Sequence, residues 1–457
     1  MRLRWVIALS AMASFSGCSS CIRHRSSSDS VDLPAAPASL TAAALTSGSI
    51  QLGWIDASSN EDGFRVERST NGASWTEVVF PAADATSCVS RGLAPSTKYY
   101  FRIRSWNAGG YSAYEGIANA TTKSVAWTIL PSSPSARMLH AAVYDPAAPQ
   151  RMMMFAGFDG NGLQNDVLAL PLAGGGGWTD LSPAAGPPAP SPRVGCTAIL
   201  DNLNNRMIVF GGSPVPGENE VWALNLSPVP YWELLLPGSI SFSAPAPRFG
   251  HTAVYDPPNQ RMIVFGGNNG GQTLNDTWAL SLPSGAGATW SLLTAFGSAP
   301  PPPRENHAAV YDSVGARMIV FGGIDNDLFW DGSVNSNGCW TLALPPGGGP
   351  TSWSALATSG PRPSHRERHS LIYDSVNERL IVFGGLDDTF PSPRGDVWTL
   401  GLTGTPAWSQ AFPLGAFPPS PRVSHTAIHD PYYGRMILFG GDDDTFTPFS
   451  DAWALEL

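Results

Sequence analysis

The sequence predicts an all-β protein in two parts, a small β-sandwich followed by a ring of repeated four-stranded units. Three observations carry this prediction. Glycine (48 residues) and proline (42) are abundant and only 14% of the 457 residues are charged, which suits many short strands joined by turns. Apolar residues alternate with polar ones in several runs between residues 33 and 122. One motif then recurs at a nearly fixed interval from residue 123 to the end.

Charge and cysteine content exclude several classes of function. The formal net charge is −10 at pH 7, which argues against a nucleic-acid partner, because phosphate backbones are bound through clusters of Lys and Arg. Five cysteines are too dispersed for a disulfide framework, and no pair in the folded region has CxxC metal spacing. We therefore expect no nucleic-acid partner and no cofactor, and a fold held together by burial of apolar side chains.

Residues 1–17 have the layout of a secretory signal. Met1 to Arg4 is basic, Trp5 to Phe15 is mostly apolar, and Ser16 and Gly17 are small. The apolar run is too short to span a bilayer as a helix. We therefore expect the protein to be exported.

The segment around Cys18 resembles the lipobox of bacterial lipoproteins, in which the cysteine after the small residues is acylated and becomes the mature N-terminus. Phe15 stands where that family usually has Leu, and cleavage that leaves Cys18 unmodified is the alternative. Ser19 resembles the outer-membrane form of the signal. The resemblance implies an outer-membrane lipoprotein, facing the periplasm or the cell surface, with residues 18–32 as a Ser-rich tether.

Residues 33–122 fit a small β-sandwich. Its alternating runs are bounded by Gly, Asn, Asp or Pro, and about seven short strands fit in this length. Trp54, the Leu93 to Tyr99 segment and the Asn107 to Ser112 loop occur in the order seen in fibronectin type III domains, which this segment resembles. We assign Trp54 and Tyr99 to core packing, not to function. No RGD tripeptide indicates integrin-type adhesion.

Residues 123–457 contain six copies of one unit. Each copy has an apolar strand ending in a glycine pair, altered to Ala156-Gly157 in the first copy, and the intervals between the second glycines are 55, 55, 56, 62 and 56 residues, from the positions Gly157, Gly212, Gly267, Gly323, Gly385 and Gly441. Tryptophans mark the third and fourth strands in most copies. This arrangement resembles the kelch repeat, which implies a β-propeller with four-stranded blades.

An arginine opens each copy, and a histidine follows three residues later in all copies except the second, which has Cys196. These residues are Arg137, Arg193, Arg248, Arg304, Arg366 and Arg422, with His140, His251, His307, His369 and His425. The arginines could form a basic collar for an anionic ligand, but recurrence in every copy favours a structural role, each pairing with an acidic residue near the third-strand Trp. We expect each histidine to hydrogen-bond within its own blade, and the Asp and Arg of each first hairpin to clamp the turn.

The ends of the repeat region predict how the ring closes. The sixth copy stops at its third strand, Asp451 to Leu457, whereas Val125 to Leu130, ahead of the first copy, has the fourth-strand pattern. The N-terminal strand would complete the last blade and leave no open edge. The sequence therefore predicts a six-bladed kelch-type β-propeller over residues 123–457.

Candidate ligand-binding residues fall on the face that carries the long second-to-third and fourth-to-first connections. They are the acidic residues Asp325, Asp327, Asp331, Asp387, Asp388, Asp442, Asp443 and Asp444, and the non-repeating residues Glu305, Asn306, His365, Glu367 and Arg368. A solvated acidic rim is the alternative, and without a recognisable metal spacing we assign no metal site.

A binding function fits the sequence better than catalysis. Copper radical oxidases and sialate mutarotases also have kelch-type propellers, so an enzyme acting on carbohydrate is the alternative. However, the tyrosines that an oxidase resembling galactose oxidase would need (Tyr144, Tyr255, Tyr311 and Tyr373) belong to repeated hairpins on the opposite face. We see no non-repeating catalytic set. We expect a monomeric, membrane-anchored protein that binds a glycan or a protein.

The lipobox resemblance gives a first testable prediction. The mature protein should begin at an acylated Cys18 and partition with membranes, and a Cys18→Ser variant should lose both properties. Mass spectrometry of the N-terminal peptide tests this directly. An unmodified N-terminus at another residue would contradict the prediction.

Overall fold

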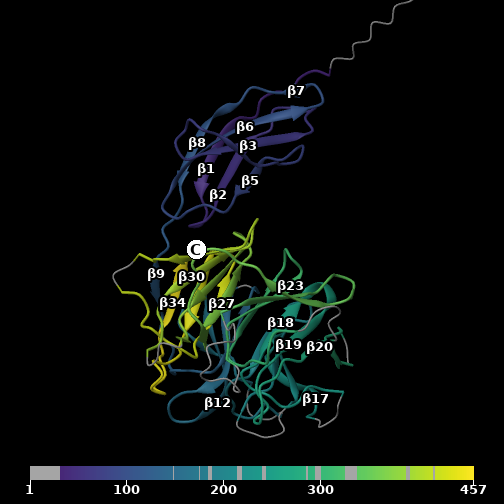
Figure 1. The fold of residues 1–457 in the computed structure, drawn as a ribbon, viewed down its shortest axis with the longest axis vertical. Helices are drawn as coiled ribbons and strands as arrows, with labels where there is room; N and C mark the ends of the chain where they lie inside the picture. The colour runs from purple at the N-terminus through teal and green to yellow at the C-terminus, as the bar shows by residue number, and fades with distance from the viewer. Residues whose placement is uncertain are drawn as a thin grey trace, which may run out of the picture.

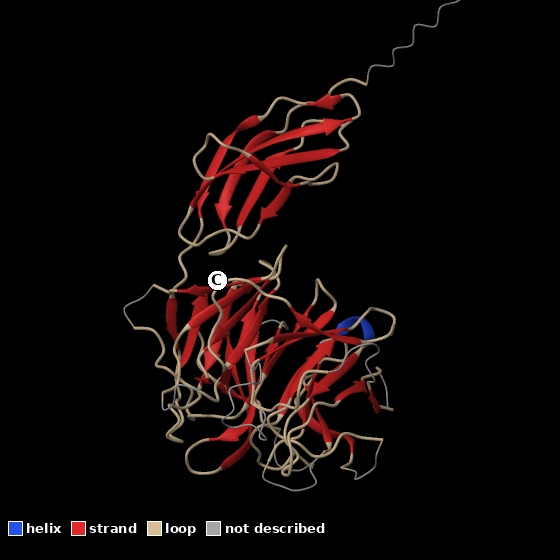
Figure 2. Cartoon of the chain, in the orientation of Figure 1, coloured by secondary structure: helices blue, strands red, loops and turns tan. Residues whose placement is uncertain are grey.

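The computed structural model describes residues 31–147, 149–173, 175–183, 188–213, 219–238, 243–284, 287–293, 300–324, 337–387, 392–414 and 417–457. The predicted signal, Cys18 and most of the predicted tether lie outside these residues. The described part consists of β-strands and one 3-10 helix, η1 (Pro257–Asn259), so the all-β prediction is confirmed (Figures 1 and 2). None of the helices in this part is long and apolar enough to cross a membrane.

The N-terminal domain is a sandwich of two antiparallel sheets (Figure 1). One sheet has the order β1-β2-β5, and the other has the order β4-β3-β6-β7 with β8 also paired to β6. The strands are β1 (Ala38–Ala44), β2 (Ile50–Ile55), β3 (Gly63–Ser69), β4 (Thr76–Val79), β5 (Ser87–Ser90), β6 (Lys98–Asn107), β7 (Gly110–Tyr111) and β8 (Glu115–Thr121). Trp54 and Tyr99 lie in the core between the sheets, and the Tyr99 hydroxyl accepts a hydrogen bond from the Ala94 amide at 3.0 Å.

The C-terminal domain contains six four-stranded antiparallel sheets, numbered here in chain order. Sheets 1 to 3 are β10 (Ala141–Asp145), β11 (Arg151–Phe158), β12 (Leu163–Pro171) and β13 (Thr179–Asp180); β14 (Thr197–Asp201), β15 (Arg206–Phe210), β16 (Val221–Asn225) and β17 (Tyr231–Leu236); and β18 (Thr252–Asp256), β19 (Arg261–Phe265), β20 (Thr277–Ser281) and β21 (Thr289–Leu292).

Sheets 4 to 6 repeat the pattern. They are β22 (Ala308–Asp312), β23 (Arg317–Phe321), β24 (Cys339–Ala343) and β25 (Ser352–Leu356); β27 (Ser370–Asp374), β28 (Arg379–Phe383), β30 (Val397–Gly401) and β31 (Ala407–Ala411); and β32 (Thr426–Asp430), β33 (Arg435–Phe439), β34 (Ala452–Glu456) and β9 (Trp127–Leu130). A short pair, β26 (Arg366–Glu367) and β29 (Leu386–Asp387), extends sheet 5 at one end.

Each sheet begins with a hairpin clamped by charge. The Asp that ends the first strand receives a hydrogen bond from the Arg that opens the second, as in Asp312 and Arg317 (2.8 Å). The other five pairs are Asp145–Arg151, Asp201–Arg206, Asp256–Arg261, Asp374–Arg379 and Asp430–Arg435, at 2.7 to 3.0 Å. The expected turn clamp is therefore present in all six sheets. The second strands behind it are buried on both faces, which explains their continuous apolar runs.

Sheet 6 joins the two ends of the domain. Its outer strand, β9, comes from the N-terminal side and pairs antiparallel with β34, the last strand of the chain, with Trp127 opposite Leu455 and Leu130 opposite Ala452. This is the pairing that the missing fourth strand of the sixth copy predicts. The first strands of the six sheets also contact one another in cyclic order, with β10 against both β14 and β32.

Backbone hydrogen bonds connect the sheets in two complete cycles. In the inner cycle, the residue two positions before each first strand donates its N–H to the carbonyl of the equivalent residue in the preceding sheet. The bonds are Gly195→Leu139, Gly250→Gly195, Asn306→Gly250, Arg368→Asn306, Ser424→Arg368 and Leu139→Ser424, at 2.8 to 3.2 Å. In the outer cycle, the second residue after each second-strand Phe donates to the carbonyl of the opening arginine of the next sheet, as Gly441 does to Arg137 (2.8 Å). Both cycles return to their starting sheet.

The N-terminal domain contacts the hairpin end of sheets 5 and 6 (Figure 1). The loop between β1 and β2 carries buried Ser47, whose amide donates to the carbonyl of the last residue, Leu457, at 2.6 Å. Asn377, in the β27–β28 hairpin, donates to the Thr46 hydroxyl at 3.4 Å, and Arg379 reaches the Ser47 hydroxyl at 3.5 Å. The opposite ends of the sheets, which carry the long connections, are not used in these contacts.

Candidate functional site

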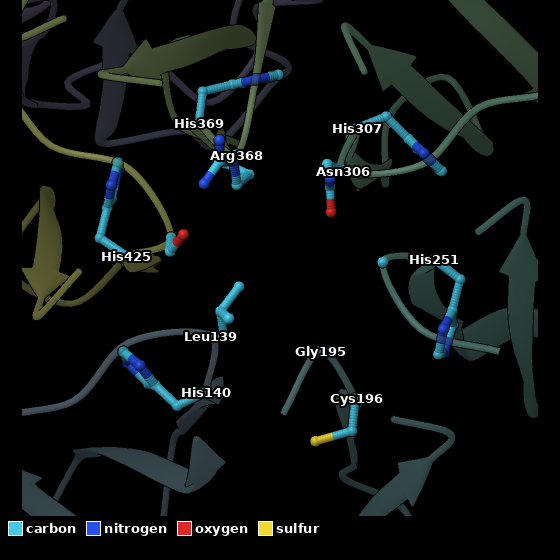
Figure 3. Close-up of a pocket in the computed structure, with 12 residues that line it drawn as sticks. Leu139, His140, Gly195, Cys196, His251, Asn306, His307, Arg368, His369 and His425 are labelled. Carbon is cyan, nitrogen blue, oxygen red and sulfur yellow. The ribbon is translucent and has the colours of Figure 1, made fainter. Parts of the chain in front are cut away.

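A cavity of about 160 Å³ lies where the six sheets meet (Figure 3). Its lining comes from all six sheets, two neighbouring residues from each, and these residues lead into the first strands from the end that carries the long connections. The twelve lining residues are Leu139, His140, Gly195, Cys196, Gly250, His251, Asn306, His307, Arg368, His369, Ser424 and His425. Of the residues predicted as ligand contacts, only Asn306 and Arg368 are among them.

The inner lining is formed by the six residues of the inner hydrogen-bond cycle, all in the left-handed backbone region with φ between 51° and 66°. Glycine adopts this region freely, but four of these residues have side chains. Leu139, Asn306, Arg368 and Ser424 therefore hold a conformation that the sheet contacts must enforce, a situation common at functional sites. The glycines at two of the six equivalent positions, Gly195 and Gly250, were the sequence signal for this ring.

The cavity lining is asymmetric. Sheets 1 to 3 contribute Leu139, Gly195 and Gly250, which offer no polar side-chain atom, whereas sheets 4 to 6 contribute Asn306, Arg368 and Ser424 (Figure 3). The innermost ring of side chains is therefore polar on one side only, although His140, Cys196 and His251 also line the cavity on the other side. This asymmetry breaks the sixfold repeat at its centre.

The polar side is linked to several of the predicted loop residues. The Asn306 amide donates to Glu367 at 2.9 Å, and Arg368 forms ion pairs with Asp444 at 3.1 Å and with Glu367 at 3.6 Å. The structure thus joins four predicted site residues from three different sheets into one chain of polar contacts.

Buried polar atoms on this side have no hydrogen-bond partner among the described residues. They are the Nε of Arg368, both ring nitrogens of His369, the Nδ1 of His307 and His425, and the Oδ1 of Asp442, while the other side has the Nδ1 of His140 and of His251. Burial raises the pKa of Asp442, and this carboxyl is only 2% exposed. Buried groups of this kind need water or a ligand to satisfy them, so the polar side of the cavity has unmet hydrogen-bonding capacity.

The five histidines lie behind the left-handed ring and connect neighbouring sheets. Each imidazole packs edge-on against the Phe that ends the second strand of the preceding sheet, with ring centroids 5.2 to 5.4 Å apart. Four of them share an Nε2 hydrogen bond with a hydroxyl of that sheet: His140 with Thr426, His251 with Thr197, His307 with Thr252, and His425 with Ser370, at 2.7 to 2.9 Å. The expectation that each histidine bonds within its own blade was therefore wrong, because the ring points across the junction.

The junction between sheets 1 and 2 departs from the pattern at three linked positions. Cys196 replaces the histidine, Ala141 replaces the hydroxyl residue that it would face, and Ala156 replaces the first glycine. In the other junctions a Cβ at that glycine would lie too close to the imidazole, for example 2.6 Å from Cε1 of His251 at Gly211. The smaller cysteine therefore makes room for Ala156, and the two are buried in the same cluster.

The six opening arginines are structural. All are at most 3% exposed, and each donates from Nη1 to the carbonyl of the first residue after the Phe that ends its own second strand, as Arg248 does to Gly266 at 2.9 Å. Five form an ion pair with the carboxylate that lies two residues before the third-strand Trp, or before Leu168 in the first copy. These carboxylates are Asp166, Glu220, Asp276, Asp396 and Asp451, at 2.6 to 2.8 Å. The fourth copy has Gly338 at that position of the repeat.

The acidic residues predicted on the long-loop face differ in environment. Asp325, Asp327, Asp331 and Asp388 lie outside the described residues. Asp387 is 6% exposed and forms an ion pair with Arg394, and it also accepts a hydrogen bond from Ser364 at 2.9 Å. Asp387 therefore lies buried in the β26–β29 pair and is not exposed to a ligand on the long-loop face.

The remaining predicted site residues differ in their exposure to solvent. Glu305 is buried and accepts from Asn268 at 3.1 Å, Asp443 is exposed, and His365 is half-buried beside the arginine that opens sheet 5.

A second cavity, of about 260 Å³, lies at the hairpin end between sheets 6 and 1. Its polar groups are committed to the fold, since Arg435 pairs with Asp430 and donates to the Leu172 carbonyl at 2.7 Å. The central cavity is the better candidate site, because its polar atoms are not all used by the protein.

Comparisons with known proteins agree with the two-domain division. The KLHDC2/KLHL20/DRC7 Kelch-repeats domain model matches residues 176–331, 232–403 and 349–457, and the fibronectin type III model matches residues 35–121. Both resemblances inferred from the motifs are thereby confirmed.

Similar curated proteins share only part of their length with this chain. An F-box/kelch-repeat protein of Arabidopsis thaliana is 28% identical over 283 residues, which are 59% of this chain and 55% of that protein. Host cell factor 1 of Homo sapiens is 28% identical over 264 residues, 56% of this chain and 12% of that protein. Adagio protein 3 of Arabidopsis thaliana is 31% identical over 256 residues, 54% of this chain and 38% of that protein. The matched region thus spans about half, or less, of each relative.

The buried histidines give a pH-dependence prediction. Burial, assisted by the nearby arginine charges, lowers the pKa of all five well below the usual 6.5, to about 3 for His251 and His425. Below about pH 6.5 the unfolded chain therefore binds more protons than the folded chain. The free energy of unfolding is highest above that pH, and it falls as the pH decreases toward the pKa values of the histidines in the folded state. Each histidine should cost about 1.4 kcal/mol per pH unit within this window.

Urea unfolding at pH 7, 6 and 5 measures this slope. The N-terminal domain, residues 33–122, contains no histidine and serves as an internal control. A His307→Gln variant keeps a side-chain hydrogen-bonding group but cannot titrate. The fall in its unfolding free energy per pH unit should therefore be smaller by the contribution of one histidine, about 1.4 kcal/mol. A C-terminal domain equally stable at pH 7 and pH 5 would contradict the prediction.

Proposed function

Because the chain belongs to the kelch-repeat family, we propose that its C-terminal domain is a closed six-bladed propeller that binds a protein partner on the long-loop face. The two cycles of inter-sheet hydrogen bonds and the pairing of β9 with β34 support closure. A closed ring holds its loops in fixed relative positions, which is a suitable platform for binding.

The asymmetric cavity is the observation that carries this proposal. The repeated charges are used inside the fold, whereas the non-repeating polar side chains of the cavity lining, Asn306, Arg368 and Ser424, all lie on one side. A partner that inserted a polar group there would satisfy the unpartnered donors, and buried hydrogen bonds of this kind give specificity. The exposed rim beyond them, including Asp443, would form the outer part of the interface.

The contacts between the two domains support a defined orientation. The N-terminal domain lies against the hairpin ends of sheets 5 and 6, so the long-loop face is turned away from the chain's N-terminus (Figure 1). We propose that an acylated Cys18 anchors an exported protein to the outer membrane and that the binding face points away from the anchor. In this arrangement the protein acts as a monomer.

A glycan ligand is a second candidate, favoured by one loop. Between β33 and β34, Phe446 is 67% exposed and lies three residues after the exposed carboxylate of Asp443. An exposed aromatic ring next to carboxylates provides a stacking surface and hydroxyl acceptors. We propose no catalytic activity, because the five histidines belong to five different sheets and four of them are bonded across the sheet junctions.

Selection of ligands on the purified full-length chain tests the proposal. A displayed peptide library and a glycan array would each be screened, and the selected ligands remeasured on Arg368→Ala and Asn306→Ala variants. We expect each variant to weaken binding at least tenfold, the effect of losing about 1.4 kcal/mol. The melting temperature should change little, because the Arg368–Asp444 ion pair is partly exposed.

Tyr432→Ala is the matched control, because Tyr432 is exposed on the opposite, hairpin end. This variant should bind like the unmodified protein. Selected ligands that respond to Tyr432→Ala, and not to the two cavity variants, would place binding on the hairpin end and contradict the proposal.

A further inference from the structure

Three carboxylates from distant parts of the sequence converge at one end of the N-terminal domain. They are Asp56, directly after β2, Glu61, two residues before β3, and Asp84, in the turn between β4 and β5. One carboxylate oxygen from each lies within 4.8 Å of the others. This end of the domain is opposite the β1–β2 loop that contacts the C-terminal domain, and thus it faces the start of the described chain.

The fold itself brings these groups together. Gly63 opens β3 at φ 152°, and a Cβ there would lie 2.7 Å from the Pro81 carbonyl, so only glycine allows the two segments to approach this closely. The Phe64 amide then donates to that carbonyl at 2.9 Å, and the Asp84 amide donates to Glu61 Oε1 at 3.1 Å. Glu61 is thereby fixed with one oxygen bonded to the neighbouring turn.

The other oxygen of Glu61, Oε2, has no hydrogen-bond partner in the described part of the chain. Glu61 is only 8% exposed, and this oxygen is buried. None of the three carboxylates forms an ion pair with an Arg, Lys or His of the described chain. Three neighbouring carboxylates, one of them buried with an unpartnered oxygen and none of them paired with a cationic side chain of the described chain, form a set of ligands that suits a bound cation.

We propose that Asp56, Glu61 and Asp84 bind one calcium ion. Calcium takes six to eight oxygen ligands at about 2.3 to 2.6 Å, so two oxygens on opposite sides of the ion lie about 4.6 to 5.2 Å apart, and a spread of up to 4.8 Å fits. Magnesium dehydrates reluctantly and is usually held by one or two carboxylates, so a set of three protein carboxylates favours calcium. Three protein carboxylates leave several positions for water, which corresponds to the weak extracellular class of site, with a Kd of about 10⁻⁴ to 10⁻³ M.

The bound ion would stabilise the entry to the domain. Asp56 accepts a hydrogen bond from the Ser58 amide at 3.1 Å, and Asn60, in the same loop, donates to the Asp32 carbonyl at 3.1 Å. Asn107 donates to the same carbonyl at 2.8 Å. The loop that supplies two of the three ligands therefore also holds the first described residues, so calcium would order the point where the tether meets the domain.

Calorimetric titration of calcium chloride into the full-length chain tests the site. We expect Glu61→Gln and Asp84→Asn each to remove one binding site or weaken it at least tenfold, while the calcium-free melting temperature stays close to that of the unmodified protein, because each amide keeps a hydrogen-bonding oxygen. Asp62→Asn is the matched control, since Asp62 is exposed and adjacent to Glu61 but lies outside the cluster. It should bind calcium normally.

Three results would overturn the proposal. They are no calcium binding by the unmodified chain at millimolar concentration, equal binding by the unmodified chain and the two cluster variants, or an equal loss in Asp62→Asn. Preference for magnesium over calcium would reject calcium as the ion. None of these outcomes depends on the ligand of the C-terminal domain.

Discussion

The C-terminal domain depends on how neighbouring sheets are joined. At its inner edge, no sheet can supply all the hydrogen-bond partners of its own backbone. The chain turns there through a left-handed residue, and the N–H of this residue points toward the preceding sheet. Six such residues, one from each sheet, from Leu139 to Ser424, are joined in a cycle by backbone hydrogen bonds. Behind this cycle the buried arginines bond the turns after the second strands, and the imidazoles fill the space between sheets. A buried backbone donor without a partner is costly, so each junction stabilises the next and the ring is favoured only when complete.

This constraint separates structural residues from those available for binding. The residues that occur in every copy, the arginines and the turn-clamping Asp–Arg pairs, are buried or paired and present little to a ligand. What distinguishes one side of the centre from the other is the set of residues that do not repeat. Asn306 and Arg368 stand where other sheets have glycine or leucine, and their neighbours Glu367 and Asp444 hold them in place. The proposed binding site is therefore the part of the ring where the repeat is broken.

The periodicity of the sequence made much of the propeller fold and its repeated structural contacts predictable. The regular spacing places an Asp opposite an Arg in the first hairpin of every copy, as in Asp312 and Arg317, and places a carboxylate near the opening arginine in five copies, as in Asp276 and Arg248. The missing fourth strand of the sixth copy implies that Val125 to Leu130 replaces it. The errors came from contacts that periodicity does not encode. The imidazole of His251 reaches Thr197 of another sheet, and Asp387 is buried by Arg394 in an irregular connection. The Glu61 cluster was also invisible in the sequence, because Asp84 joins it only through the close approach at Gly63.

The closed ring is the central claim, and amide hydrogen exchange tests it most directly. The account predicts that the amides of Leu139, Gly195, Gly250, Asn306, Arg368 and Ser424 exchange slowly and at similar rates, because each opens only when the ring unfolds. The decisive amides are those of Leu139 and Gly441, which join sheets 6 and 1 where the two ends of the domain meet. Exchange of these two amides as fast as that of exposed loop amides, with the other junctions still protected, would contradict closure.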